Sequence, residues 1–185
     1  MHNVAEAITE IEIISQAQNG DRDAFSSLVL TYREAVINVV YRMCGEAVLS
    51  EDAAQIAFLK AWQNLHTYQP KASFRSWLFR IAINAALDIL RREKPVVDIE
   101  LLPIADQNNG PQKQVESRER GKLIQDAVLS LPEASRKVLI LREYQGMSYR
   151  EISETLEIPT GTVMSRLNYG RKRLVEILRP CLEEV

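Results

Sequence analysis

The stretch that most constrains what this chain can fold into is residues 147–173, MSYREISETLEIPTGTVMSRLNYGRKR. Ser148 and Glu151 have the spacing of a capping box, in which each side chain accepts a hydrogen bond from the backbone N–H of the other residue. The helix that this box begins carries Ile152 and Leu156 on one apolar face. The pattern therefore predicts a short amphipathic helix that packs against a neighbour.

A second helix is predicted directly after it. Pro159 disfavours the α region for the residue before it, so the first helix ends there. Thr160 is predicted to cap the second helix, on which Val163 and Leu167 form an apolar edge. The side chains that point away from this edge are Thr162, Ser165, Arg166 and Tyr169. This arrangement is typical of a helix-turn-helix, whose second helix lies in the DNA major groove. A plain pair of helices with a solvated basic face gives the same pattern.

The distribution of charge supports contact with a polyanion more than the net charge does. The chain has 185 residues and a formal net charge of −2. Residues 74–92 nevertheless contain four arginines and one aspartate, and residues 160–179 contain five basic residues and one glutamate. Acidic residues gather instead at 6–12 and 46–52. Two basic faces on an acidic background predict two points of contact with a polyanion.

Several classes of protein are disfavoured by the sequence. No apolar run approaches the ~18 residues of a membrane span, and the acidic N-terminus lacks a signal peptide, so we expect a cytoplasmic protein without direct membrane insertion. Cys44 and Cys181 stand far apart and suggest neither a metal site nor a disulfide framework. His2 and His66 have no catalytic partner at a recognised spacing, and no phosphate-binding loop occurs. We therefore predict no catalytic residue, no metal, no cofactor and no small-molecule substrate.

The order of helix-capping residues, and of stretches in which apolar residues repeat at helical spacing, predicts an all-α chain with two small domains. The first, residues 1–94, contains helices at 11–18, from an Asp21 cap to about Cys44, at 51–65 after a Ser50 cap, and at 74–92 after a Ser73 cap. Residues 95–117 contain three prolines and no sustained helical period, which predicts a flexible linker. Helices resume at about residue 118 and form the second domain, 118–185. The acidic segment 4–14 is either a first helix of the bundle or a further partner contact.

Four stretches together match one family. They are NGDRDAF at 19–25, EDAAQIAFLKAWQNL at 51–65, SFRSWLFRIAINAALDILRR at 73–92 and SYREISETLEIPTGTVMSRL at 148–167. Over nearly its whole length the chain resembles bacterial RNA polymerase sigma factors of the extracytoplasmic-function (ECF) group. In that family a helix bundle, region 2, is joined by a flexible linker to a helix-turn-helix domain, region 4. The resemblance implies an alternative sigma factor that binds core RNA polymerase, directs promoter recognition and opening, and is controlled by an anti-sigma factor.

The resemblance also implies where the polymerase binds. Residues 51–65 would dock on the coiled-coil clamp helices of the β′ subunit, and region 4 would contact the β flap. The residues expected at the clamp are Asp52, Gln55, Phe58, Leu59 and Trp62. An aromatic anchor among polar groups has the composition of an interface hot spot. Trp62 could equally belong to the core of the bundle.

Two promoter elements are assigned in the same way. The loop 66–73 and the helix after it would read and melt the −10 element, with bases held by pockets and by stacking. The residues expected there are Tyr68, Lys71, Phe74, Arg75, Arg80, Asn84, Arg91 and Arg92. Region 4 would read the −35 element, with arginine paired to guanine as the commonest specific contact. The residues expected there are Tyr149, Arg150, Thr160, Thr162, Ser165, Arg166, Arg171, Lys172 and Arg173.

Two other functions remain open at this stage. A helix-turn-helix repressor or activator with a helical sensor domain would bind duplex DNA alone, as a symmetric dimer. A helical adaptor would need neither basic face. The sigma-factor hypothesis instead predicts weak DNA binding by the isolated chain and strong binding within the polymerase.

Overall fold

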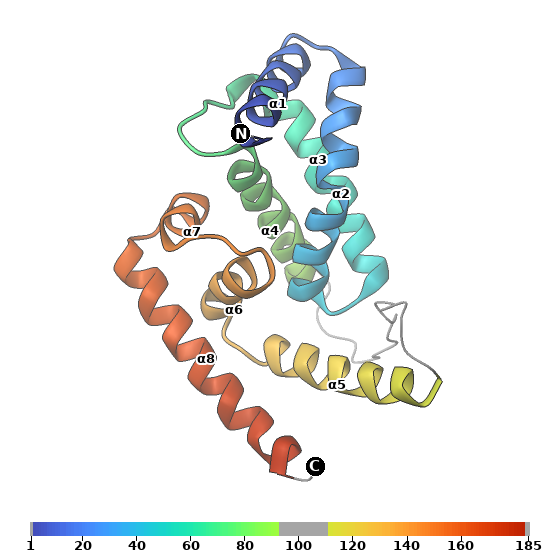
Figure 1. The fold of residues 1–185 in the computed structure, drawn as a ribbon, viewed down its shortest axis with the longest axis vertical. Coiled ribbons are helices and arrows are strands. Elements are labelled where there is room, and N and C mark those ends of the chain that lie inside the picture. Colours follow the sequence, from blue (N-terminus) through green and yellow to red (C-terminus); the bar gives the residue numbers. More distant parts are fainter. Residues whose placement is uncertain (1, 93–110, 184–185) are drawn as a thin grey trace.

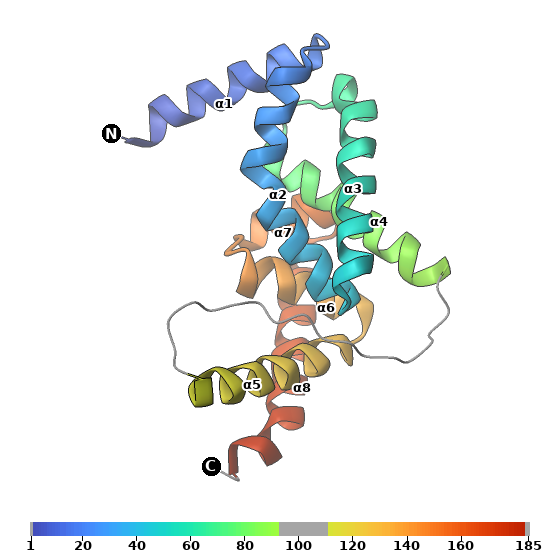
Figure 2. The same ribbon diagram turned by 90° about the vertical axis from the view of Figure 1, so that its right-hand side faces the viewer.

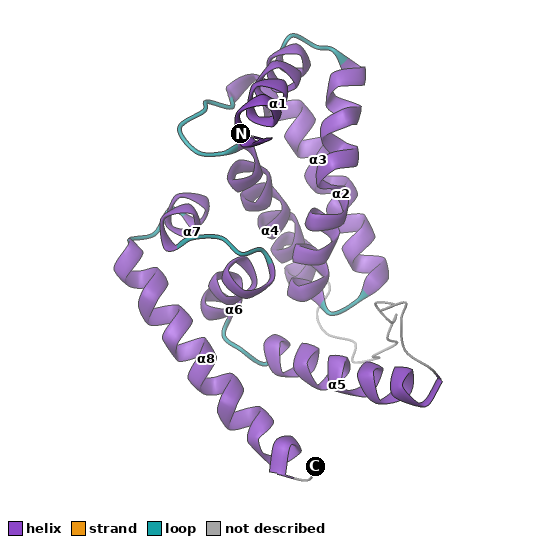
Figure 3. Ribbon diagram, in the orientation of Figure 1, coloured by secondary structure: helices purple, strands orange, loops and turns teal. Residues whose placement is uncertain are grey.

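The computed structural model describes the backbone of residues 2–92 and 111–183, and the side chains of residues 10–92 and 119–180. Within these ranges the chain forms helices and no strand, which confirms the all-α prediction (Figure 3). The helices are α1 (His2–Gln18), α2 (Arg22–Cys44), α3 (Ala47–Asn64), α4 (Phe74–Arg92), α5 (Pro111–Leu129), α6 (Glu133–Leu139), α7 (Tyr149–Leu156) and α8 (Thr160–Glu183). A 3-10 turn, η1 (Leu65–Thr67), follows α3, and a π-helical turn, η2 (Ile140–Tyr144), follows α6.

The predicted linker is only partly within the structure. Residues 95–110 lie outside the described residues. Residues 111–117 form the start of α5, so that helix begins inside the stretch that was predicted to be linker. A proline at the first helical position is favourable, because its missing N–H would have no partner there. Pro111 occupies this position in α5.

Helix α1 ends, and helix α2 begins and ends, where their sequences predict. Asp21 Oδ1 accepts hydrogen bonds from the backbone N–H groups of Asp23 (2.9 Å) and Ala24 (3.1 Å), as an N-cap should. Gly20 and Gly45 adopt φ values of 92° and 82°, in the left-handed region that glycine enters without a steric penalty. Helix α1 extends further towards the N-terminus than predicted, and leaves the top of α2 at an angle (Figure 2).

The predicted start of α3 is wrong. The helix begins at Ala47, one turn before the predicted first residue, and Ser50 lies inside it rather than at its cap. The Ser50 side chain is buried and donates a hydrogen bond back to the carbonyl of Glu46. A serine hydroxyl can therefore find a hydrogen-bond partner within a helix. A serine alone is for this reason a weak indication of where a helix begins when neighbouring residues favour an earlier start.

Helix α4 is buried around most of its circumference. It packs against α2 and α3 on one side and against α7 on the other (Figure 1). Its buried residues are Phe74, Ser76, Leu78, Phe79, Ala82, Ile83, Ala85, Ala86, Leu87 and Ile89. Alanine and serine on this helix let three neighbours approach it closely, so α4 is the centre of the molecule.

The second half of the chain forms its own layer of helices. Leu131, Val138 and Leu139 are buried between α6 and the long helix α8. Gly170 lies where α8 crosses α6, and a Cβ there would come within 3.3 Å of Leu139 Cδ1. Pro132 is the N-cap of α6.

The two halves pack against each other at the C-terminal end of α2. The Gln125 amide, on α5, donates to the carbonyls of Tyr41 (3.3 Å) and Arg42 (3.4 Å). Arg136, on α6, donates to the carbonyl of Met43 at 3.1 Å. The last carbonyls of a helix have no partner within it and carry the negative end of its dipole. Side chains of the second half thus satisfy the exposed end of a helix in the first.

We predict that two leucine-to-alanine substitutions separate core from surface. Leu78 is 1% exposed on α4, whereas Leu59 is 57% exposed on α3. Leu78→Ala should lower the free energy of unfolding by about 2–5 kcal/mol, because it leaves a cavity in the core. Leu59→Ala should change it by less than about 0.5 kcal/mol. Urea unfolding followed by circular dichroism measures both, and equal losses would contradict this description of α3 and α4.

Candidate nucleic-acid interface

The capping box predicted at the start of α7 is present. The Ser148 hydroxyl accepts a hydrogen bond from the backbone N–H of Glu151 at 3.2 Å, and Glu151 Oε2 accepts one from the backbone N–H of Ser148 at 2.7 Å. Hydrogen bonding of the Glu151 carboxylate with the side chain and the backbone N–H of Ser148 lowers the pKa of Glu151, and the nearby Arg75 guanidinium lowers it further. Both orphan donors of the helix start are satisfied, so the entry into the helix pair has a defined direction.

A short turn sets the angle between α7 and α8. Glu157 ends α7 in the left-handed region at a φ of 52° and donates its N–H to the carbonyl of Ser153. The Ser153 hydroxyl donates to the carbonyl of Ile158 at 2.6 Å. Helix α8 begins at Thr160 itself, with the Pro159 carbonyl accepting from Thr162 and Val163, so Thr160 is not the cap that was predicted.

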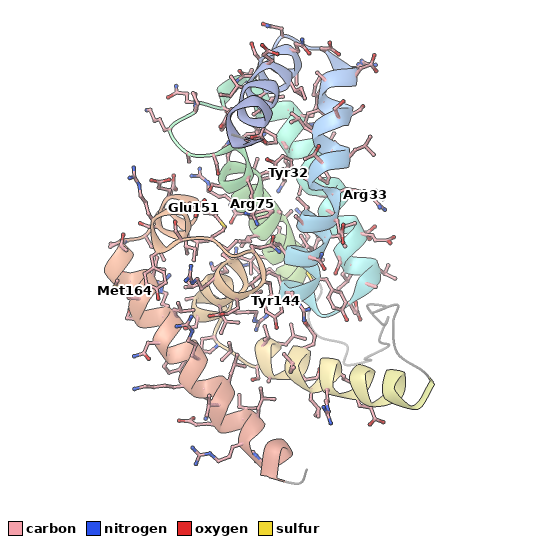
Figure 4. All side chains as sticks on the ribbon, viewed as in Figure 1. Tyr32, Arg33, Arg75, Tyr144, Glu151 and Met164 are labelled. Carbon is pink, nitrogen blue, oxygen red and sulfur yellow. The ribbon has the colours of Figure 1, made fainter. Side chains whose placement is uncertain are left out.

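The apolar edges of α7 and α8 meet as the sequence predicted. Ile152, Val163 and Leu167 are buried with at most 1% exposure. Other side chains of α8 face outward: Met164 is 52% exposed (Figure 4). Tyr169 is also 52% exposed. The −35 residues predicted on this helix are exposed or half-buried: Thr160, Thr162, Ser165, Arg166, Arg171, Lys172 and Arg173. The geometry is that of a helix-turn-helix with an accessible second helix.

Several basic residues of this half are engaged in pairs. Arg171 donates twice to Glu143, at 2.9 and 2.6 Å, and so ties α8 to η2. This pairing raises the pKa of Arg171. The predicted phosphate contact Arg150 pairs with Glu154 on its own helix at 2.9 Å. Tyr149, predicted beside it, is half-buried under the Arg142 guanidinium. These partners hold cations at the surface in fixed positions.

The basic face of α4 meets the second half of the molecule rather than open solvent. Arg75 donates to the Gln145 carbonyl at 2.7 Å and to its side-chain oxygen at 3.2 Å, and lies opposite Glu151 (Figure 4). Arg80 pairs with Glu157, at the end of α7. Arg91 lies 3.8 Å from Glu133 on α6. Three arginines that were predicted to contact the −10 element thus have partners in the second half of the chain. Arg75 and Arg80 are half-buried, whereas Arg91 and Asn84 are exposed.

The face of α3 predicted to bind the polymerase is accessible. Asp52, Gln55 and Leu59 are exposed at helical spacing, and Phe58 is half-buried. Trp62 is half-buried and packs against Phe25, with ring centroids 4.9 Å apart. Asp52 and Gln55 also line a groove of about 290 Å³, whose other lining residues are Leu49, Ile56, Ile89 and Arg92. The sequence did not reveal this groove, because it joins the start of α3 to the end of α4. Arg92 therefore lies with the predicted polymerase contacts.

The loop between η1 and α4 rests on an aromatic cluster. The Tyr68 ring packs against Phe74 (5.6 Å) and Trp77 (5.3 Å), and its hydroxyl donates to the Ala72 carbonyl at 2.9 Å. Burial raises the pKa of Tyr68, and the negative charge of Glu10 raises it further. Phe74 is only 3% exposed, so we withdraw it from the expected DNA contacts. Lys71 is exposed at the loop tip.

Comparison with known proteins agrees with this geometry. Residues 28–96 match the family model for sigma-70 region 2, and residues 121–174 match that for sigma-70 region 4. The ECF RNA polymerase sigma factor SigW of Bacillus subtilis is 37% identical over 177 residues, which cover 90% of this chain and 95% of SigW. The chain belongs to the ECF sigma factors. The ECF sigma-E factor of Escherichia coli K12 is 30% identical over 97% of this chain and 99% of its own length.

Solved structures show the same fold. CnrH, in its complex with the cytosolic domain of CnrY, superposes on this chain with a TM-score of 0.72 at 24% identity. The match covers 91% of this chain and 96% of CnrH. RpoE of Bartonella quintana, in its complex with the anti-sigma factor NepR, has a TM-score of 0.68 at 22% identity. Helices α2–α4 therefore correspond to region 2, and α5–α8 contain region 4. Sigma factors are transcription initiation factors. Among the described residues, no helix is long and apolar enough to cross a membrane.

We predict that the capping box makes stability depend on pH. Because the folded-state pKa of Glu151 is lowered, its charge stabilises the fold above the unfolded pKa of about 4.3, and this contribution is lost as the pH falls through the folded value. Wild type should therefore exceed Glu151→Gln in free energy of unfolding at neutral pH, and the difference should vanish in strong acid. Urea unfolding across this range measures it. In a Ser148→Ala background, which itself costs about 1 kcal/mol, the pH dependence should shrink. A difference that is constant with pH would contradict the assignment.

Proposed function

We propose that this sigma factor directs core RNA polymerase to promoters with −35 and −10 elements, reading the −35 element with α8 and the −10 element with the loop 66–73 and α4. The observation that carries the proposal is the accessible face at the start of α8, supported from behind by Ile152, Val163 and Leu167. In a sigma factor, such a helix is suited to the major groove. We also assign this chain to the cytoplasm, where the polymerase acts.

Within region 4, base reading and phosphate contact fall to different parts of α8. Thr160, Ser165 and Arg166 lie in its first two turns, the part of a recognition helix that reaches base edges. Arg171 and Lys172 follow further along and are exposed, which suits phosphate contacts that position the helix without reading sequence. Arg171 already has Glu143 as a partner, so a phosphate would compete with that carboxylate or share the guanidinium with it.

Docking on the polymerase is proposed for α3. Leu59 is exposed beside polar Asp52 and Gln55, and the groove at Leu49 and Ile89 offers an apolar recess next to them. A central apolar anchor with a polar rim is the usual anatomy of a protein interface. The clamp helices of the β′ subunit are the partner that the family implies, and the β flap would bind region 4.

DNA binding by α4 requires the two halves of the chain to separate. Gln145 occupies Arg75, and Glu157 competes with a phosphate for Arg80, as long as the two halves stay together. We therefore infer that the compact arrangement is the state of the sigma factor outside the polymerase, and that docking on the polymerase opens it. CnrH and RpoE were each solved with a partner, CnrY and NepR. An anti-sigma factor that stabilised the compact arrangement would keep this chain inactive.

A repressor or activator that binds duplex DNA alone is the second candidate. The accessible face of α8 would serve such a protein equally well. A repressor or activator differs from a sigma factor because it requires neither an exposed α3 face nor the polymerase. The transcription assay below separates the two functions.

The proposed function predicts promoter-directed transcription that depends on particular residues of α8. Core RNA polymerase with this chain should produce discrete transcripts from promoter fragments of the source genome, and core polymerase alone should not. Arg166→Ala should reduce them by about 5- to 150-fold and relax sequence preference at one −35 position. Lys172→Ala should weaken all promoters evenly. Duplex binding by the isolated chain without any effect on core polymerase would favour the repressor function instead.

Opening of the compact arrangement can be followed directly. Donor and acceptor dyes on Thr31→Cys in α2 and Asn168→Cys in α8, both exposed positions, would report the separation of the two regions. Cys44 and Cys181 would be replaced by alanine in this variant. We expect energy transfer to be high in the isolated chain and to fall when core polymerase is added. Unchanged transfer in the transcriptionally active complex would contradict the inferred opening.

A further inference from the structure

Gln18, the last residue of α1, contacts a segment far away in the sequence. Its side-chain amide donates one hydrogen bond to the carbonyl of Leu65 (3.0 Å) and another to the carbonyl of Tyr68 (2.9 Å). A glutamine amide has two N–H donors, so both are used. These carbonyls lie at the two ends of the 3-10 turn η1, where α3 ends and the −10 loop begins.

Both carbonyls lie at a helix end, where backbone carbonyl groups lack N–H partners within the helix. The Leu65 carbonyl also accepts from the Tyr68 N–H at 3.0 Å, which closes the turn. Tyr68 itself is extended, with φ of −62° and ψ of 128°, so the chain changes direction at this residue. Gln18 therefore holds the point at which the chain leaves the helix, in addition to the hydrogen bonds that η1 makes among its own residues.

The rest of the loop is anchored from this point. The Tyr68 hydroxyl reaches across to the Ala72 carbonyl at 2.9 Å, and the Tyr68 ring lies in the cluster with Phe74 and Trp77. Residues 69–71 are exposed between these anchors. Any shift of Tyr68 would thus move the loop tip relative to α4.

Helix α1 is itself held against the same cluster at a second point. Tyr32 on α2 donates its hydroxyl to Glu10, and its ring lies 5.5 Å from that of Phe74. Burial and this hydrogen bond raise the pKa of Tyr32. Two residues of α1, Glu10 near its middle and Gln18 at its end, therefore tie this helix to the bundle.

We propose that Gln18 is a positioning residue for promoter recognition: it sets the place of the −10 loop, and so tunes discrimination at the −10 element without contacting DNA. This inference rests on the proposed function of the chain. A shift of a reading element by a fraction of its contact distance is enough to weaken selective contacts strongly, even when the residue at fault lies far from them.

The test compares Gln18→Met with Gln16→Met in the full chain, bound to core polymerase. Methionine keeps the length of the side chain and removes both donors. Gln16 lies on the same helix, is exposed, and donates no side-chain hydrogen bond among those that the structure describes. The probe is a promoter fragment that the wild-type chain transcribes, with single base substitutions in its −10 or its −35 element.

A mismatched base should cost wild type about 5- to 150-fold in transcript yield at either element. We expect Gln18→Met to reduce the −10 penalty several-fold, while the −35 penalty and the affinity for core polymerase stay at the values of Gln16→Met. A −10 penalty equal to that of Gln16→Met would overturn the proposal. So would a parallel loss at both elements or a fall in core affinity, because these outcomes indicate a merely structural role. Failure of wild type to support any transcription would instead refute the proposed function.

Discussion

The arrangement of this sigma factor depends on the burial of α4 from two sides. On one side α4 packs against α2 and α3, as in any helix bundle. On the other side it packs against α7, and its buried residues include Ile83 and Leu87. Burial of apolar surface stabilises the folded state by roughly 25 cal/mol per Å². A helix that is apolar on several faces is therefore most stable when other helices pack against all of these faces. The arginines of α4 flank the covered side. The packing that joins regions 2 and 4 therefore brings arginines that we propose to contact DNA up to their interface.

The strength of that interface suits a reversible contact. The pair between Arg80 and Glu157 has 43% and 69% of its side chains exposed, and such surface pairs contribute about 0–1 kcal/mol. The hydrogen bonds of Gln125 and Arg136 to the end of α2 are more sheltered, but they replace bonds that water would otherwise make. Core polymerase offers region 2 and region 4 separate docking surfaces in our proposal. Modest binding energy at each would be enough to open the molecule.

Local signals in the sequence predicted the helix ends best where a side chain acts on its own backbone. The Asp21 cap and the Ser148–Glu151 capping box need only neighbouring residues, and both are present. Ser50 shows the limit, since its hydroxyl found a partner within α3 instead. Phe74 shows another limit: an aromatic residue beside a DNA-binding loop has suitable chemistry, yet tertiary packing buries it. Gln18 was missed because nothing local distinguishes it from the exposed Gln16.

The sequence by itself determined that the chain is all-α and that it contains a helix-turn-helix, because helix caps, proline breaks and the periodicity of apolar residues act over a few residues. Its four motifs, in order, also indicated the ECF family, which the comparisons confirmed. Only the tertiary structure decided that Arg75, Arg80 and Arg91 meet region 4, that Asp52 and Arg92 share a groove, and that Gln18 supports the loop after α3. Each of these contacts joins residues far apart in the chain. Which polar group meets which depends on how the helices pack, and no local pattern encodes that.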